Sequence, residues 1–448
     1  MFAPLKNLAA DLAAGKTSSE KLTEEALTRI GDAKGEGGRA YTDVFTEAAR
    51  AAAKASDALR ASGVVPSPLA GIPISVKDLF DIRGRVTMAG SVARKDEPAA
   101  NEDAPVVARL RAAGAVILGR TNMTEFAFSG LGLNPHYGTP KNPFDRETGR
   151  IPGGSSSGAA ISVTDGMAAA GIGTDTGGSV RIPSALNGLT GFKPTARRVP
   201  TDGAFPLSWA LDSIGPLARS VDCCALLDAI MAGEAPSDVT PLSVKGMRLV
   251  VPGTMVMDDM DEHVAKTFEA ALDKLSAAGA LLEEKSFEWL LEIPASNKAG
   301  GFAPTEAYAI HRELLSRKES VYDPRVATRI QGGAKMAAAD YVILSRRRVE
   351  IQAVANAATR GYDAVLMPTV PQIAPSIASL ETDEHLYHTM NLLMLRNPSL
   401  GNFLDRSAVS LPCHEAGTAP VGLMVMGETM GDAKTLSVAA GIEAVLEK

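Results

Sequence analysis

Short apolar runs that alternate with a helical pattern restrict the fold of this chain more than any other feature. Residues 72–76 alternate like a short strand, residues 103–113 have the pattern of a helix, and the apolar run 115–118 follows that helix. This alternation is typical of a parallel or mixed sheet on which helices pack. The sequence therefore predicts an α/β fold.

The first 62 residues are predicted to be helical. Apolar residues recur at helical spacing in residues 5–12 and 22–30, and residues 43–62 form an alanine-rich helix. The sequence Thr-Ser-Ser-Glu at residues 17–20 fits a capping box, in which Thr17 caps the second helix.

A polar stretch near the middle of the chain is a candidate domain boundary. Residues 233–246 look like a connection, but equally apolar strands are predicted on both sides of it. After it we expect strands at 248–252, 364–367, 408–411 and 421–426 and helices at 262–278 and 339–358. We therefore expect one continuous sheet and a single domain over residues 1–448.

Charge and composition exclude several classes of function. The 52 Asp and Glu residues outnumber the 45 Lys and Arg residues, and a net charge of -7 gives no electrostatic footprint for nucleic acid or an anionic membrane. No apolar run approaches the ~18 residues of a spanning helix. Three cysteines are too few for a disulfide scaffold, and no His or Cys spacing indicates a metal site. We expect a cytoplasmic protein without a metal.

Two segments rich in glycine and serine lie in residues 134–215, a stretch that we expect to be mostly loops. Residues 149–158 read Gly-Arg-Ile-Pro-Gly-Gly-Ser-Ser-Ser-Gly, and residues 171–183 read Gly-Ile-Gly-Thr-Asp-Thr-Gly-Gly-Ser-Val-Arg-Ile-Pro. A long loop-rich stretch inside a compact domain is usually functional. Glycine lets backbone N–H groups approach a ligand, which is what an oxyanion hole around a nucleophile requires.

Each segment alone has a simpler interpretation. Residues 154–158 match the Gly-x-Ser-x-Gly nucleophile elbow with Ser156 at its centre, but that elbow follows an apolar strand and here a polar stretch precedes it. Residues 173–179 resemble a phosphate loop without its lysine, and either segment could be an ordinary turn. Lys77, at the end of the first predicted strand, adds a base, because serine nucleophiles can use lysine.

Residues 73–78 (Pro-Ile-Ser-Val-Lys-Asp), 152–158 and 173–183 together resemble the amidase signature family. Shorter matches at 120–123, 191–195, 212–216 and 367–369 extend the resemblance over nearly the whole chain, most densely over 66–220. The resemblance implies a single large α/β/α domain with a twisted mixed sheet covered by helices. In the family, the second half of the chain, here residues 247–448, completes the sheet and shapes the substrate pocket.

The family hydrolyses amide C–N bonds with a Ser–cis-Ser–Lys triad and needs no cofactor. Carried over by motif, Lys77 resembles the base, Ser155 the cis-serine that relays the proton, and Ser179 the nucleophile. The resemblance also implies an oxyanion hole built from the backbone N–H groups of Thr176, Gly177, Gly178 and Ser179. Ser157 stands where many members have glycine, so Ser156 and Ser157 stay alternatives to Ser155.

A lysine base must be neutral to accept a proton. An unperturbed lysine has a pKa of ~10.4, so only about 0.04% of it is neutral at pH 7. Burial would have to lower the pKa of Lys77 to ~7–8. An acidic neighbour would oppose that shift, so we expect the Asp78 side chain to point away, as successive residues on a strand do.

Candidate substrate-binding residues follow from position alone. They are Met123, Phe126, Ser156 and Asp175. Arg181 could bind a substrate carboxylate, but a structural ion pair is the favoured interpretation. The apolar segment 390–395 favours a hydrophobic acyl group.

The expected function is a free-standing amidase that converts a small carboxylic amide to an acid and ammonia or an amine through a seryl acyl-enzyme. One alternative is a glutaminase-type A subunit of a tRNA-dependent amidotransferase, which would pass ammonia to a partner subunit. Another is a hydrolase of ureide-type substrates such as carboxybiuret or allophanate, for which Arg181, Arg317 and Arg396 are candidate carboxylate donors. A homo-oligomer is compatible with all three.

Overall fold

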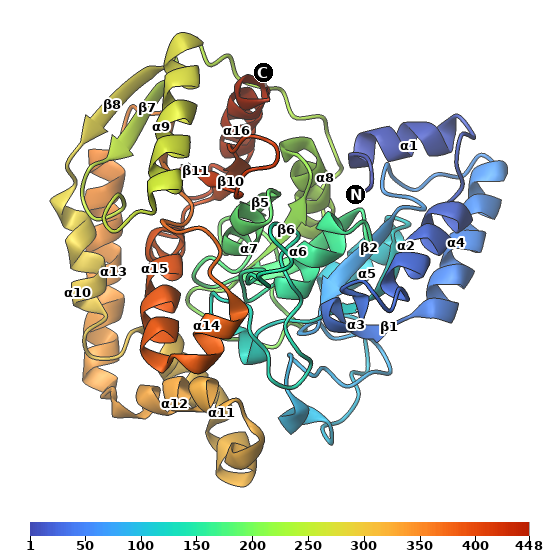
Figure 1. Ribbon diagram of the computed structural model, residues 1–448, viewed down its shortest axis with the longest axis horizontal. Coiled ribbons are helices and arrows are strands. Elements are labelled where there is room, and N and C mark those ends of the chain that lie inside the picture. The colour runs from blue at the N-terminus through green and yellow to red at the C-terminus, as the bar shows by residue number, and fades with distance from the viewer. Residues whose placement is uncertain (448) are drawn as a thin grey trace.

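A single eleven-stranded mixed sheet runs through the computed structural model, which describes residues 1–447 (Figure 1). The strand order is β1-β3-β2-β4-β6-β5-β10-β11-β9-β7-β8. The strands are β1 Tyr41–Val44, β2 Pro73–Lys77, β3 Val116–Thr121, β4 Ala170–Asp175, β5 Thr190–Lys193, β6 Ser213–Ala218, β7 Arg248–Pro252, β8 Leu281–Lys285, β9 Ala364–Pro368, β10 Ala408–Pro412 and β11 Gly422–Met426. The predicted α/β fold and the single continuous sheet are confirmed.

Parallel and antiparallel pairs occupy different parts of this sheet. Strand β2 pairs in parallel with β3 and β4, and β7 pairs in parallel with β8 and β9. The strands between these two groups pair antiparallel, from β4 through β6, β5, β10 and β11 to β9. Because β2 and β4 are parallel neighbours, their carboxyl ends meet at one edge of the sheet.

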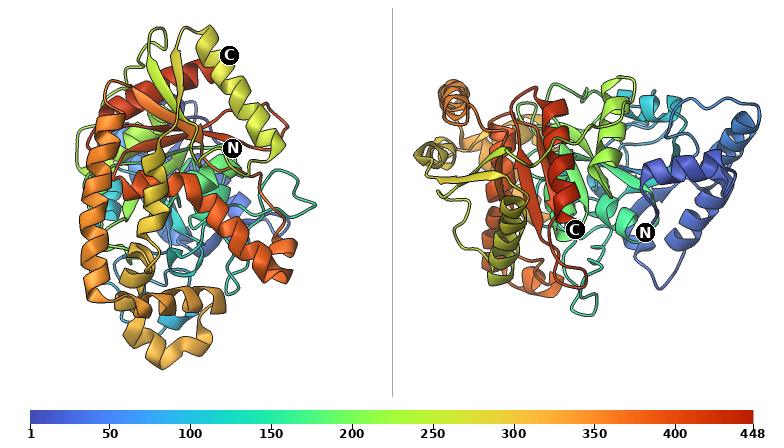
Figure 2. Two further views of the ribbon diagram at one scale, coloured as in Figure 1. Left: turned by 90° about the vertical axis from the view of Figure 1, so that its left-hand side faces the viewer. Right: turned by 90° about the horizontal axis from the view of Figure 1, so that it is seen from above.

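Helices cover both faces of the sheet (Figure 2). They are α1 Leu5–Ala13, α2 Ser19–Ile30, α3 Gly37–Ala40, α4 Thr46–Ala61, α5 Pro105–Ala112, α6 Ser157–Thr164, α7 Arg181–Leu186, α8 Val221–Ala232, α9 Glu262–Ala277, α10 Glu292–Ser296, α11 Phe302–Lys318, α12 Pro324–Gly332, α13 Ala338–Ala358, α14 Ile377–Thr382, α15 Glu384–Phe403 and α16 Asp432–Leu446. Helices α1, α2 and α4 lie at one end of the molecule, and α10 and α13 lie at the other (Figure 1).

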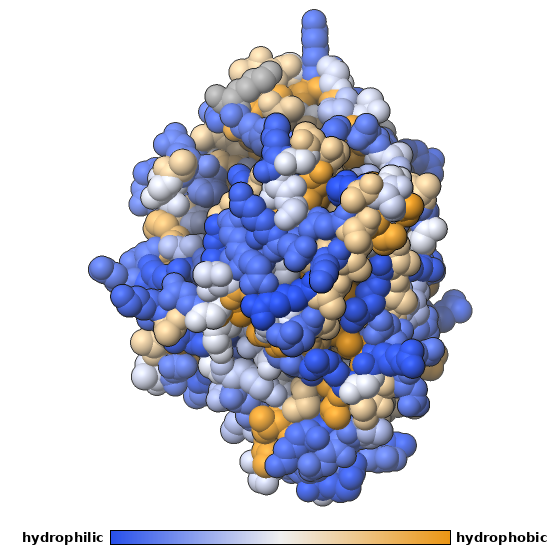
Figure 3. All heavy atoms as spheres, turned by 90° about the vertical axis from the view of Figure 1, so that its right-hand side faces the viewer, coloured by the Kyte–Doolittle hydropathy of each residue, from blue (hydrophilic) through white to orange (hydrophobic). Residues whose placement is uncertain are grey.

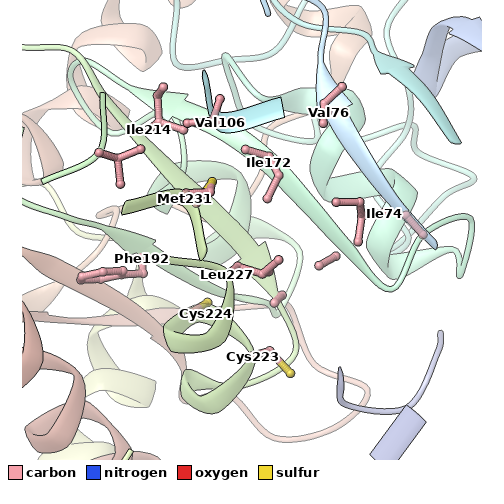
Figure 4. Packing of buried hydrophobic residues seen from close by; sticks show 14 of the residues in the cluster. Ile74, Val76, Val106, Ile172, Phe192, Ile214, Cys223, Cys224, Leu227 and Met231 are labelled. Carbon is pink, nitrogen blue, oxygen red and sulfur yellow. The ribbon is translucent and has the colours of Figure 1, made fainter. Parts of the chain in front are cut away.

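The alternation of side chains along β4 explains how two helices pack on opposite faces of it. Ile172 lies in the hydrophobic core with Leu227 of α8 (Figure 4). Gly171 and Gly173 point to the other face, where a β-carbon would come within 3.0 Å of Ala159 and 2.6 Å of Ser156. Glycine is therefore required at both positions for α6 to lie this close to the strand.

Most of the stretch 134–215 lies outside helices and strands, as expected, but the prediction missed the short elements α6, β4, α7, β5 and the start of β6 within it. Its glycine, serine and alanine residues permit close packing of buried elements, so composition alone misidentified them. The N-cap of α2 is Ser18 instead of Thr17, and it accepts a hydrogen bond from the Lys21 backbone N–H. This register buries Ser19, which donates to the Gly71 carbonyl at 2.8 Å.

The outer surface is mainly polar on the side of the N-terminal elements. Figure 3 shows hydrophilic residues over most of that face, with small hydrophobic groups scattered among them. Among residues 1–447, no helix has the length and apolar character needed to cross a membrane.

Candidate active site

Three elements bring the predicted catalytic residues to one edge of the sheet. Lys77 is the last residue of β2, and Ser179 lies between the end of the neighbouring parallel strand β4 and helix α7. Ser155 lies in the segment that leads into α6, and α6 packs against both strands. The three residues are all buried, with Ser179 4% exposed.

Lys77 has two hydroxyl partners. Its Nζ donates to Ser155 Oγ at 2.7 Å and to Thr174 Oγ1 at 2.9 Å. Burial lowers the pKa of Lys77 from 10.5 to about 7, against the opposing effect of the Asp175 and Asp212 carboxylates. About half of the lysine is therefore neutral near pH 7, as a general base requires.

The Asp78 side chain points away from Lys77, as expected. Its Oδ2 accepts a hydrogen bond from the Gly90 backbone N–H at 3.0 Å, and its Oδ1 lies 3.3 Å from Arg120 Nε. The carboxylate that follows Lys77 in sequence is therefore directed into a different set of contacts.

Contacts distinguish the three consecutive serines. Of these three serines, Ser155 alone has a hydrogen bond to Lys77 among the described residues. Ser156 Oγ donates to the Thr174 carbonyl at 3.4 Å, and Ser157 Oγ donates to the Asn122 carbonyl at 3.3 Å. The peptide bond between Gly154 and Ser155 is cis. The hydrogen bond to Lys77 distinguishes Ser155 from Ser156 and Ser157 as the candidate relay.

The proposed oxyanion hole loses one of its four donors. The Gly178 backbone N–H donates to Asp175 Oδ1 at 2.8 Å, so it is not available to a substrate. The backbone N–H groups of Thr176, Gly177 and Ser179 donate to no acceptor in residues 1–447. Three donors at or next to Ser179, the candidate nucleophile, thus remain available for the oxyanion hole that the sequence predicts.

A buried ion pair supports the turn that carries Ser179. Arg181 Nη2 donates to Asp175 Oδ1 at 2.8 Å and to Asn402 of α15 at 2.7 Å. Burial alone would raise the pKa of Asp175, but Arg181 holds it below its usual range. The prediction that Arg181 is a structural ion-pair partner is confirmed. Since Asp175 is fully occupied by Arg181, Asn402 and the Gly178 N–H, it is not placed to bind substrate.

A cavity of about 160 Å³ opens beside Ser179. It is lined by Ala127, Phe128, Ser129, Thr176, Gly177, Ser179, Leu207, Leu211, Ala303, Arg329, Leu395 and Ser399. Ligand pockets commonly measure ~300–1,000 Å³, so this one suits a small acyl group. Lys77 and Ser155 do not line this cavity and are fully buried.

An adjoining cavity of about 270 Å³ shares Ala127, Thr176 and Leu207 with the first. Asp212 lines it and accepts a hydrogen bond from Thr176 Oγ1. Burial raises the pKa of Asp212 to about 6. No group of three or more His, Cys, Asp or Glu residues in the described chain is arranged to hold a metal ion.

The other substrate candidates do not line the cavity beside Ser179. Met123 and Ser156 are fully buried, and Phe126 packs against Phe205 and Tyr322. The candidate carboxylate donors are also elsewhere: Arg396 donates to the carbonyls of Val256 and Asp258, and Arg317 is exposed beside Glu97. Of the apolar segment 390–395, Leu395 reaches the cavity wall.

Sequence reasoning missed Arg329, the one cation in that wall. It stands in helix α12, about 150 residues from Ser179, and no local motif marks it. Only the fold shows that it shares a cavity with the nucleophile.

Comparison with known proteins identifies the family of this chain. The family model described as Amidase matches residues 21–436. The chain belongs to the amidase family. The 2-amino-5-chloromuconic acid deaminase of Comamonas testosteroni is 37% identical over 404 residues, which cover 89% of this chain and 86% of that protein.

Two further amidase relatives span most of the chain. The 1-carboxybiuret hydrolase subunit AtzE of Pseudomonas sp. (strain ADP) is 36% identical over 82% of this chain and 81% of that protein. A crystal structure described as that of an amidase superposes with a TM-score of 0.88 at 34% identity and covers 99% of both chains. The predicted family and the predicted enzyme class, an amide C–N hydrolase, are confirmed.

Proposed function

We propose that this amidase hydrolyses small carboxylic amides through an acyl-enzyme on Ser179, with Ser155 as proton relay and Lys77 as base. The observation that carries the proposal is the 2.7 Å hydrogen bond between Lys77 Nζ and Ser155 Oγ, together with the place of Ser179 in the cavity wall. Burial lowers the pKa of Lys77 to about 7, which suits a general base near neutral pH.

The first half of the reaction acylates the enzyme. Ser179 Oγ attacks the amide carbon while its proton passes to Ser155 Oγ, whose own proton passes to neutral Lys77. The N–H groups of Thr176, Gly177 and Ser179 bind the oxyanion of the tetrahedral intermediate. The C–N bond then breaks, and the proton held by Lys77 returns through Ser155 to the leaving nitrogen.

The second half releases the acid. Water attacks the acyl-enzyme and gives up its proton through the same relay, and the ester bond to Ser179 Oγ breaks with return of a proton to that oxygen. Each residue ends in its starting state, so the cycle consumes only water and amide and requires no cofactor.

Ammonia release by the purified chain tests the proposal. The panel comprises aliphatic amides, aryl amides, glutamine and carboxylated ureas. We expect turnover of one class that is abolished in Ser179→Ala and falls by at least ~10³-fold in Lys77→Met and Ser155→Ala. Ser157→Ala is the matched control, since Ser157 is buried beside the relay but bonds only to the Asn122 carbonyl, and it should keep most activity.

Two alternatives give different results in the same assay. A subunit of a tRNA-dependent amidotransferase would be nearly inactive alone and gain glutaminase activity with its partner. A ureide hydrolase would act on the carboxylated ureas only.

The three cysteines are free, which supports the predicted location in a reducing compartment, the cytoplasm.

A further inference from the structure

Arg329 is an arginine without a carboxylate partner in the wall of the catalytic cavity. Its Nη1 donates to the Phe128 carbonyl at 2.6 Å, and its Cζ lies 4.4 Å from the centre of the Phe128 ring. In residues 1–447 no carboxylate pairs with it, and burial lowers its pKa with only the Tyr387 hydroxyl opposing. A guanidinium has five N–H donors, so most of them remain for a ligand.

The arginines of this fold differ in their partners, since Arg348 and Arg406 donate only to carbonyl, amide or hydroxyl oxygens whereas others pair with a carboxylate. Arg181 pairs with Asp175 at 2.8 Å, and Arg325, one turn before Arg329 in α12, pairs with Glu384. A partly buried cation with spare donors is costly unless an anion meets it. Arg329 differs from the other arginines without a carboxylate partner because it lines the cavity beside Ser179, where a ligand could supply the anion.

The remaining wall of the cavity has no negative charge. No Asp or Glu lines it among the described residues, and six apolar side chains do: Ala127, Phe128, Leu207, Leu211, Ala303 and Leu395. An ammonium group buried there would find no carboxylate to compensate the loss of its hydration. The cavity can therefore pair one negatively charged ligand group with Arg329, and it offers no carboxylate to a positively charged group.

We infer that Arg329 binds a carboxylate on the acyl part of the substrate, and that the substrate is a small monoanionic amide without an ammonium group. The inference rests on the proposed function, because it assumes that the scissile amide lies at Ser179 in the same cavity. The carboxylate would accept two parallel N–H bonds from the guanidinium, and its carbon chain would lie against the leucines.

Matched amides separate the effect of the substrate carboxylate from the effect of an added ammonium group. Succinamate and glutaramate carry the carboxylate, asparagine and glutamine are the same molecules with an added ammonium group, and pentanamide is neutral. We expect kcat/KM for the better monoanion to exceed that for its ammonium-bearing counterpart and for pentanamide by about 30-fold or more. Equal or better turnover of glutamine or pentanamide would overturn the inference while leaving the amidase function intact.

Variants of Arg329 test whether the preference for the monoanionic amide depends on this residue. Arg329→Gln should lower kcat/KM for the monoanion by about 30-fold or more and for pentanamide by less than about threefold, with Arg329→Lys intermediate. Arg312→Gln removes an exposed arginine of α11 and should change neither value. If Arg329 only supports the Phe128 carbonyl, Arg329→Gln will lower kcat/KM equally for the monoanion and for pentanamide. That result would contradict the inference.

Binding to the Ser179→Ala protein keeps the two proposals apart. Calorimetry should show binding of succinamate or glutaramate that weakens by about 30-fold or more in Ser179→Ala/Arg329→Gln. Such binding without turnover by the wild-type enzyme would contradict the hydrolytic function and retain the anion site. No Arg329-dependent binding of either monoanion would contradict the anion site.

Discussion

The proposed role of Lys77 as the base predicts how activity depends on pH. Lys77 is fully buried between two hydroxyl groups, and burial lowers its pKa from 10.5 to about 7. The neutral form accepts the proton, so kcat/KM should rise about tenfold per pH unit below pH 7 and level off above it. A pH–rate profile from pH 5 to 9 measures this. Lys77→Arg keeps a permanent charge and should be inactive throughout, whereas a profile that falls between pH 6 and 8 would exclude Lys77 as base.

Residues that act within one short motif could be predicted from the sequence. Lys77, Ser155 and Ser179 each stand in a contiguous motif, and their positions at strand and helix ends bring them together. Gly178 was assigned wrongly as an oxyanion donor, because the competing Asp175 acceptor appears only when the turn is folded. Arg329 could not be predicted at all, since its defining property is the lack of a partner in three dimensions.

The turn between β4 and α7 depends on its packing against α15. Gly178 has φ of 130°, and a β-carbon on it would lie 2.6 Å from Pro398 and 2.7 Å from Ile182. A side chain therefore strains the backbone and clashes with a helix at the same time. Gly178→Ala should lower the free energy of unfolding by roughly 2–4 kcal/mol. Denaturant unfolding of the variant measures this loss.

The adjacent glycine provides the control for this element. A β-carbon on Gly177 would meet only Leu395, at the ordinary contact distance of 3.4 Å. Gly177→Ala should therefore unfold near the wild-type denaturant concentration. Similar losses of stability in the two variants would show that the turn does not rely on contact with α15.

Elements with a clear hydrophobic period were predicted well, and buried glycine-rich elements were not. Strand β7 and helices α9 and α13 match the predicted ranges to within about one residue. Helix α6 and strand β4 lie in the stretch expected to be loops, because their small residues pack closely without giving an apolar period. At this scale the error has one cause: glycine permits close packing as readily as it permits turns.

At the scale of the whole molecule, the sheet joins two halves of the chain that a polar connection separates in sequence. Residues 233–246 contain no helix or strand, as predicted, yet β5 from the first half pairs with β10 from the second. Arg181 and Asn402 bond across the same boundary, and the cavity takes Ser179 from one half and Arg329 from the other. The two halves are therefore parts of one structure and share one site.

Cleavage of the connection at residues 233–246 tests whether the two halves of the chain form one structure. A protease site inserted between the exposed residues Thr240 and Pro241 would allow cutting after folding. The two fragments should elute together in gel filtration and keep amidase activity within about twofold, because the β5–β10 pairing and the buried core persist. They should separate only in denaturant, in a single transition that abolishes activity. Fragments that part under native conditions, or a first half that is active alone, would show instead that the connection divides independent units.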